Sequence, residues 1–104
     1  MYDSGVPVDD SPPLGFQWDR EKARRNLAKH GLSFKEGAEA VDSEGPIERL
    51  DADHSEEEER WLLLGTTESD RLVVVSYTMR GDDVRIISVR SPTRQERDAF
   101  GQRR

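Results

Sequence analysis

Residues 60–90 of this 104-residue chain read RWLLLGTTESDRLVVVSYTMRGDDVRIISVR, and the prediction of the fold class depends mainly on this segment. It contains three segments rich in β-branched and other apolar residues, at 60–67, 71–79 and 84–90. Short polar turns separate the segments, at 68–70 and 81–83. Segments of this length and composition, joined by such turns, are typical of an antiparallel β-meander. The sequence therefore predicts three consecutive antiparallel strands.

Two short helices are predicted upstream of the meander. Asp19 is a suitable N-cap, and Gly31 can adopt the left-handed conformation that often ends a helix. Ser33 and Glu36 stand at the spacing of a capping box, which starts a second helix directly after the first. The two predicted helices cover residues 22–30 and 34–41.

The remaining elements complete the α+β class. Thr93 is a suitable N-cap for a last helix over residues 94–100. Residues 16–18 and 46–51 can each form a short strand. The predicted order is β-α-α-β-β-β-β-α, in which two N-terminal helices and one C-terminal helix pack on an antiparallel sheet.

Length and composition limit the class of protein further. We expect one domain over residues 15–104, preceded by a disordered tail over residues 1–14, which are rich in Pro, Gly and Asp. The absence of cysteine excludes disulfides, zinc–thiolate sites and thiol nucleophiles. No apolar run is long enough to span a membrane and no signal peptide is visible, so a cytoplasmic protein is expected.

A helical wheel assigns directions to the side chains of the first helix. Ala23, Leu27 and His30 recur at helical spacing and share one face, which should turn towards the core. Lys22 and Lys29, seven residues apart, lie together on the adjacent flank. The lysines, rather than the histidine, are therefore expected to face solvent.

Alternation along the strands predicts which side chains share a face of the sheet. In the last strand one face should carry Val84, Ile86, Ser88 and Arg90, and the other Arg85, Ile87 and Val89. Both faces then have apolar side chains at their centres. Because the helices can cover only one face, the other should meet a partner, a second copy of the chain or a ligand.

The charge is unevenly distributed. The net charge of -6 argues at first against a nucleic-acid partner. However, residues 16–35 carry six basic and two acidic side chains, and residues 80–104 carry seven and four. The acidic residues concentrate in the N-terminal tail and in residues 51–60. The two basic segments could form one basic face, or they could be ordinary solvated surface.

Motifs for most catalytic sites are missing. The two histidines are far apart in sequence, and no metal-ligand spacing, Walker loop or Rossmann glycine pattern occurs. We therefore expect no metal and no cofactor. What remains is chemistry by His, Lys, Arg and Tyr, such as RNA cleavage by attack of a ribose 2′-hydroxyl on the adjacent phosphate.

Two segments carry a resemblance to a known family. Residues 16–41, FQWDREKARRNLAKHGLSFKEGAEAV, resemble the opening of the BrnT family, roughly F-x-W-D-x-x-K-x-x-x-N-x-x-K-H-G-[VL]-S-F-x-E-A. The residues that fit it are Phe16, Trp18, Asp19, Lys22, Asn26, Lys29, His30, Gly31, Ser33, Phe34 and Glu36. A later signature is matched by Glu59, Arg60, Gly65, Arg80, Arg85, Ile86, Ile87, Ser88, Arg90, Thr93, Glu96 and Arg97. Gly37 and Pro92 depart from the pattern, and Gly37 is expected to loosen the second helix.

The resemblance implies a function and a set of partners. BrnT-like proteins are toxins of bacterial type II toxin–antitoxin pairs, with a RelE-like fold and a ribonuclease activity that arrests translation. It implies neutralisation by a BrnA-like ribbon-helix-helix antitoxin, through which operator DNA is contacted only indirectly. A homodimer within that complex is also possible.

Candidate site residues follow from this chemistry. The phosphate stabilisers are Lys22, Lys29, Arg60, Arg80 and Arg90, and the acid/base candidate is His30. The arginines could instead form structural ion pairs with Asp19, Glu36 or Glu96. His30 could instead be packed or cap its helix, and His54 is expected at the surface.

A second hypothesis comes from another class of protein. The chain could be a non-catalytic binding module that acts only in antitoxin pairing and operon control. The acidic loop and the net charge of -6 favour this reading. Growth arrest on induction of the chain alone would distinguish the enzyme from the module.

Overall fold

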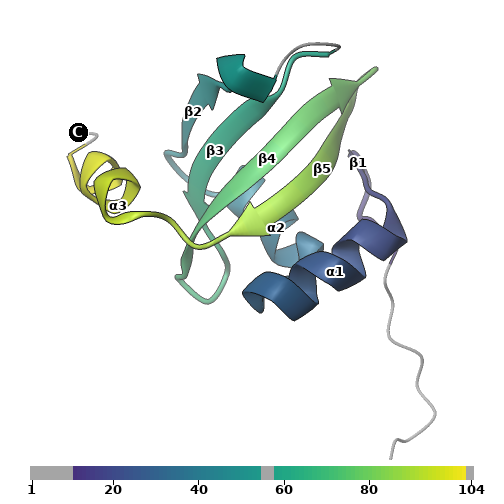
Figure 1. Cartoon of the computed structure of the whole chain (residues 1–104), viewed down its shortest axis with the longest axis horizontal. Coiled ribbons are helices and arrows are strands. Elements are labelled where there is room, and N and C mark those ends of the chain that lie inside the picture. The colour runs from purple at the N-terminus through teal and green to yellow at the C-terminus, as the bar shows by residue number, and fades with distance from the viewer. Residues whose placement is uncertain (1–10, 55–57, 103–104) are drawn as a thin grey trace, which may run out of the picture.

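The computed structural model of the chain describes residues 11–54 and 58–102 (Figure 1). In chain order its elements are β1 (Phe16–Gln17), α1 (Arg20–His30), α2 (Phe34–Val41), β2 (Ile47–Leu50), the 3₁₀-helix η1 (Ala52–His54), β3 (Trp61–Thr66), β4 (Leu72–Arg80), β5 (Asp83–Arg90) and α3 (Arg94–Gly101). The α+β class with three α-helices and a sheet is confirmed, whereas η1 was not predicted. Most of the predicted tail, residues 1–10, lies outside the described residues.

The five strands form one sheet in the order β1-β5-β4-β3-β2. β2 to β5 pair antiparallel with their neighbours, but β1 pairs parallel to β5. The expectation of a purely antiparallel sheet is therefore wrong at this edge. Short connections force β3, β4 and β5 to alternate in direction, whereas β1 is separated from β5 by most of the chain and lacks that constraint.

The predicted helix caps are confirmed, although α1 begins at Arg20, two residues before the predicted start. The Asp19 carboxylate accepts hydrogen bonds from the backbone N–H groups at the start of α1, and Gly31 ends that helix at φ 69°. Ser33 with Glu36 forms the predicted capping box of α2. Thr93 caps α3 through the same motif, with Glu96 as its third helical residue.

A β-bulge in β5 changes which of its side chains share a face. β4 pairs with Ile86 and then with Ser88, so Ile87 is an extra residue in the ladder. Ile86 and Val89 both face the core, with 1% and 0% of their surface exposed. Ser88 and Arg90 turn to the opposite face, so the strict alternation predicted for this strand is wrong beyond Ile86.

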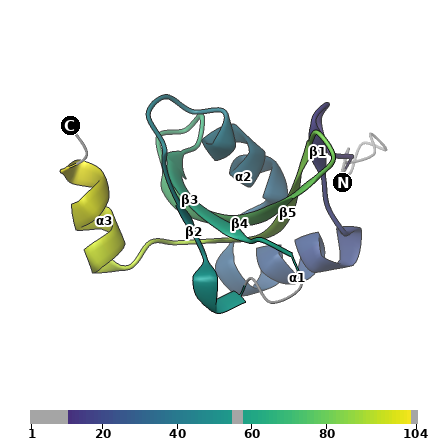
Figure 2. The same ribbon diagram turned by 90° about the horizontal axis from the view of Figure 1, so that it is seen from above.

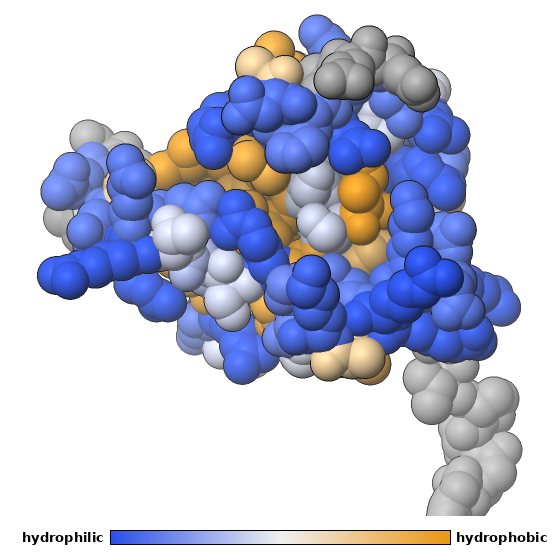
Figure 3. All heavy atoms as spheres, in the orientation of Figure 1, coloured by the Kyte–Doolittle hydropathy of each residue, from blue (hydrophilic) through white to orange (hydrophobic). Residues whose placement is uncertain are grey.

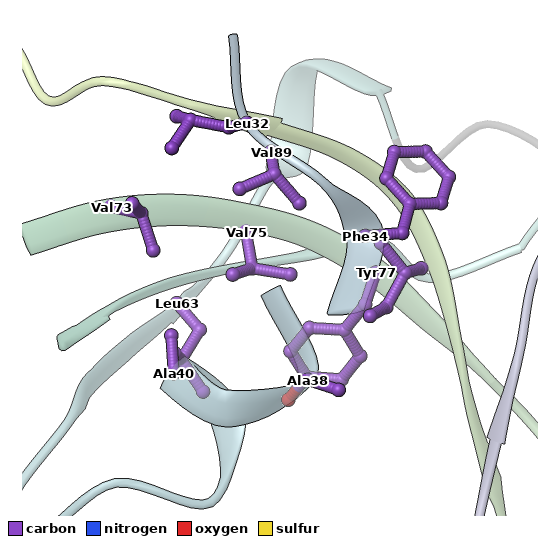
Figure 4. Packing of buried hydrophobic residues seen from close by; sticks show 10 residues of the cluster. Leu32, Phe34, Ala38, Ala40, Leu63, Val73, Val75, Tyr77 and Val89 are labelled. Carbon is purple, nitrogen blue, oxygen red and sulfur yellow. The ribbon is translucent and has the colours of Figure 1, made fainter. Parts of the chain in front are cut away.

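The hydrophobic core lies between α2 and the sheet. Figure 2 shows the sheet curving around α2, with α1 and η1 on its other side. Phe34, the first residue of α2, is 1% exposed and packs edge-to-face on Trp18, with ring centroids 5.9 Å apart. Leu63 and Val75, from β3 and β4, meet α2 in the middle of the cluster (Figure 4).

Two glycines allow α2 to approach the sheet closely. A Cβ atom at Gly37 would lie 2.6 Å from Cγ2 of Val89, and one at Gly65 would lie 2.6 Å from the carbonyl oxygen of Ala40. α2 continues unbroken through Gly37, the residue expected from the family departure to loosen this helix. Its role is to make room for a β-branched side chain of β5.

We expect Gly65→Ala to lower the free energy of unfolding by about 1–3 kcal/mol. The added methyl would collide with the Ala40 carbonyl and with Oγ of Ser43, 2.9 Å away, and backbone cannot yield as a flexible side chain can. Gly101→Ala is the matched control, because a Cβ atom there meets nothing within 4 Å. Denaturant melts of the two variants should differ, and equal midpoints would contradict the steric role of Gly65.

α1 meets the sheet through Asn26 rather than through the predicted Leu27. Asn26 is 7% exposed, whereas Leu27 is 52% exposed, so the predicted core position of Leu27 is wrong. The Asn26 side chain donates to the carbonyls of Leu32 (2.9 Å) and Val89 (2.8 Å) and accepts from the N–H of Val89 (3.1 Å). β1 pairs with only the first part of β5, so the Asn26 amide takes the place of a neighbouring strand at Val89.

Candidate functional site

One carboxylate, that of Glu58, is bound by Arg80 of β4 and lies within the electrostatic reach of two further arginines. Arg80 donates through Nε and Nη2 to the two oxygens of Glu58, at 3.2 and 3.1 Å. This hydrogen bonding holds the pKa of Glu58 below its ordinary value, and the charges of Arg60 and Arg85 lower it further. We call Arg60, Arg80 and Arg85 the arginine cluster.

The arginine cluster is continuous with the first turn of α1. The pKa of Asp19 is lowered, first by hydrogen bonds from the backbone N–H groups of Lys22 and Glu21 and then by the charges of Lys22 and Arg85. Lys22 and Arg85 therefore act on the same carboxylate. Two of the predicted strand arginines and one predicted lysine are brought together here, with Arg85 as an additional member.

Arg90, by contrast, is engaged in a bidentate ion pair. Its Nη1 and Nη2 donate to the two carboxylate oxygens of Glu96, at 2.8 and 2.9 Å. The pair lowers the pKa of Glu96 to about 2, and Glu96 also accepts from the backbone N–H of Thr93 in the capping box. Arg90 therefore joins β5 to α3, which is the structural alternative that the sequence left open for it.

Lys29 and His30 lie at the other end of α1. Seven residues of helix separate Lys29 from Lys22, which is about 10 Å along the axis. Lys29 is exposed and His30 is partly buried in the last turn, where a cation also suits the helix C-terminus. The structure therefore does not join these two candidates to the arginine cluster through any contact of the described residues.

The sheet face opposite α2 is apolar in its middle. Leu62 and Leu64 on β3 alternate with the core-facing Leu63. Val74 on β4 pairs with Leu64 and therefore lies on the same face. Figure 3 shows this apolar area in the centre of the molecule's face, surrounded by hydrophilic residues. Leu64 and Val74 are only 7% and 2% exposed, so neighbouring atoms already cover most of their surface. We call this surface the outer sheet face.

Arg85 is the cluster residue that was not among the predicted phosphate stabilisers. Arg85 pairs with Thr78 and lies on the same side of the sheet as Arg80. Its position within the cluster follows from the β4–β5 hairpin, whose two-residue turn places Arg80 opposite Asp83. The sequence feature that points to Arg85 is a charged residue inside an apolar strand, next to a tight turn.

The arrangement is suited to binding an anion with several oxygens. A guanidinium group presents paired N–H donors to phosphate oxygens and stays charged at any physiological pH. Within residues 11–54 and 58–102, no group of three or more His, Asp or Glu residues is placed to hold a metal ion. No helix in this part of the chain is long and apolar enough to cross a membrane.

Comparisons with known proteins agree with this architecture. The family described as "Ribonuclease toxin, BrnT, of type II toxin-antitoxin system" matches residues 18–96. The search of curated proteins found no match. Among solved structures, the 1.1 Å crystal structure of the Brucella abortus ribonuclease toxin BrnT is similar, with a TM-score of 0.54 and 24% sequence identity. The similarity covers 76% of this chain and 96% of the Brucella chain.

Proposed function

The chain belongs to the BrnT family of ribonuclease toxins of type II toxin–antitoxin systems, and we propose that it cleaves RNA without a metal ion. In this reaction a ribose 2′-oxygen attacks the adjacent phosphorus and displaces the 5′-oxygen. The protein must supply positive charge for the phosphorane and groups that move protons. The arginine cluster is the part of the structure that supplies the charge.

One observation carries this proposal, namely that Arg80 donates two hydrogen bonds to the Glu58 carboxylate, which also lies within the electrostatic reach of Arg60 and Arg85. A second anion can compete for this position of positive charge. A scissile phosphate that displaced Glu58 would receive bidentate hydrogen bonds from Arg80. Lys22, whose charge acts on Asp19 together with that of Arg85, would extend the positive surface to a neighbouring phosphate.

The family assignment also supports proposals about partners. We propose a RelE-like arrangement, a cytoplasmic location and neutralisation by a ribbon-helix-helix antitoxin of the BrnA type. The antitoxin would also make the contacts to operator DNA. The outer sheet face, with its apolar centre, is the surface most suited to bury area against a protein.

The test is induction of the chain alone in a bacterium, with mapping of RNA ends. We expect growth arrest and new RNA ends, and we expect Arg60→Ala combined with Arg80→Ala to reduce cleavage by about 100-fold or more. Arg24→Ala with Arg71→Ala is the matched control, since both arginines are exposed and lie outside the cluster. Cleavage by purified protein should persist in EDTA, and loss of cleavage there would refute metal independence.

The alternative of a non-catalytic module keeps one supporting observation, the apolar outer sheet face. If that alternative holds, induction leaves growth and RNA intact while the chain still binds the antitoxin tightly. Full RNA cleavage by the Arg60 and Arg80 double variant would instead refute the role of the cluster and leave the enzyme class standing.

A further inference from the structure

His54 and Asp51 form a hydrogen-bonded pair at the end of β2. Nδ1 of His54 lies 2.9 Å from Oδ2 of Asp51. The histidine side chain is 65% exposed, whereas the aspartate side chain is only 14% exposed. The carboxylate is therefore the anchored partner and fixes the ring. With Nδ1 engaged, Nε2 is the ring atom that can exchange a proton with a bound molecule.

The backbone ties this pair to the arginine cluster. The N–H of Asp51 donates to the carbonyl of Arg60 at 2.8 Å, and the N–H of His54 donates to the carbonyl of Asp51 at 3.2 Å. The first bond fixes η1 to the residue that precedes β3. His54 is thereby linked to the backbone of Arg60, a member of the arginine cluster, through the short η1 turn.

The pair also lies on the appropriate side of the sheet. Figure 2 shows η1 on the side opposite α2, where α1 also lies. The negative charge of Asp51 also contributes to raising the pKa of Arg90, at the far end of β5. Asp51 is therefore within electrostatic reach of Arg90, while its backbone is bonded to Arg60. A strand of RNA along the outer sheet face would pass between these arginines and beside His54.

From this geometry we infer that His54 transfers protons in the reaction and that Asp51 is its positioning residue. The inference rests on the proposed function. His54 Nε2 takes the proton of the 2′-hydroxyl as the 2′-oxygen forms its bond to phosphorus. The P–O5′ bond then breaks, and the 5′-oxygen receives a proton from the imidazolium. The products are a 2′,3′-cyclic phosphate and a 5′-hydroxyl, and the enzyme returns to its starting state.

The assignment differs from the prediction made from sequence. His30 is partly buried in α1 and about two turns from Lys22, whereas His54 is exposed and fixed by a carboxylate. An aspartate that orients a histidine selects one tautomer and stabilises the imidazolium that forms in the reaction. Asp51 and His54 could also do no more than close the η1 turn, so the experiment has to separate catalysis from local structure.

The experiment measures cleavage of labelled messenger RNA, free and ribosome-bound, by the purified full chain. We expect His54→Ala to reduce the single-turnover rate by about 100-fold or more. Binding of a non-cleavable 2′-O-methyl RNA should stay within about twofold of wild type, since Nε2 acts on the reacting proton and not on the phosphate charge. Added imidazole should restore part of the rate to His54→Ala, which a structural role of the histidine would not allow.

The positioning role of Asp51 has its own control. We expect Asp51→Asn to lower the single-turnover rate by about tenfold or more, with little change in RNA binding. Asp53→Asn, an exposed carboxylate in the same turn, should leave both quantities unchanged. Far-ultraviolet circular dichroism and melting curves would confirm that each variant folds, and His54→Gln provides a second variant of similar size.

Four outcomes would overturn the inference. Cleavage by His54→Ala within about threefold of wild type, or loss of cleavage without imidazole rescue in a folded protein, would remove His54 from the reaction. Loss of cleavage in His30→Ala with activity retained in His54→Ala would assign the role to the other histidine. Wild-type protein that cleaves neither free nor ribosome-bound RNA would overturn the proposed function and this inference together.

Discussion

Asn26→Asp is expected to lower the free energy of unfolding by about 3–5 kcal/mol at pH 7, a large part of the stability of a domain of this size. The side chain is nearly isosteric, so packing is retained. One oxygen can still accept from the N–H of Val89. The other oxygen would replace an N–H donor that lies 2.9 Å from the Leu32 carbonyl and 2.8 Å from the Val89 carbonyl. A buried negative charge would then face two oxygens that carry negative partial charge.

The same variant should show a characteristic dependence on pH. Burial and the two carbonyl oxygens raise the pKa of the introduced carboxyl above its value in the unfolded chain. The folded state then binds the proton more tightly, so the deficit against wild type shrinks as pH falls through the raised pKa. Urea melts of both proteins across pH 4–8 would measure this. Gln95→Glu, the same type of change on the exposed surface of α3, is the control.

A deficit in Asn26→Asp that is small, or that does not vary with pH, would contradict this account of Asn26. It would mean that the carbonyls of Leu32 and Val89 find other donors when the amide is lost. The N-terminal helix would then be held mainly by the contacts around Ala23 and Trp18, which pack against the edge of the core.

The helix boundaries could be predicted from sequence because each depends on a few neighbouring residues. Asp19, Gly31 and Thr93 act through backbone groups within their own turn, so local sequence is sufficient. The role of Asn26 could not be predicted in this way. Its partner Val89 is 63 residues away, and nothing near Asn26 reveals an unpaired strand edge. An asparagine on the inner face of a helix was the only signal.

The bulge at Ile87 shows a second limit of sequence reasoning. The side chains of β4 alternate between the two faces of the sheet, but β5 accommodates one residue more than its partner. Apolar side chains at Ile86, Ile87 and Val89 fit either register, so their pattern does not reveal the extra residue. The prediction therefore failed at the position that decides where Arg90 points.

The candidate site was predicted in part for similar reasons. Their positions on or beside apolar strands marked Arg60, Arg80, Arg85 and Arg90 as residues that need an explanation. Sequence could not show that Glu58 pairs with Arg80, because that contact depends on the path of the 51–60 loop. Nor could it show that Arg90 has Glu96 as its partner, although that pair was one of the alternatives.

The arginine cluster leads to the second large effect, because Glu58 should oppose RNA binding. In the free protein its carboxylate occupies two donors of Arg80 and lies within the field of Arg60 and Arg85. A phosphate must displace it before it can take the same donors. Glu58→Gln removes the competing charge and keeps the shape, so we expect tighter binding of non-cleavable RNA, on the order of fivefold at low salt.

Removal of the Arg80 guanidinium, in place of the Glu58 charge, should weaken RNA binding and so test whether the two groups act as a pair. Arg80→Ala should weaken binding on the order of tenfold and reduce the slope of log affinity against log salt by about 0.7, the value for one phosphate contact to a single strand. In Arg80→Ala, the further change Glu58→Gln should have a smaller effect than in wild type, because the pair is already broken.

Glu44→Gln separates this effect from net charge, since it removes one exposed carboxylate from the loop between α2 and β2, away from the cluster. If Glu44→Gln and Glu58→Gln tighten binding equally, long-range charge alone accounts for the gain and the cluster has no special part in it. If only Glu58→Gln does so, and only when Arg80 is present, then the carboxylate occupies the phosphate position in the free protein. The backbone N–H of Asp51 donates to the carbonyl of Arg60, so this result would place the phosphate in a cluster whose backbone also holds the proposed proton-transfer pair.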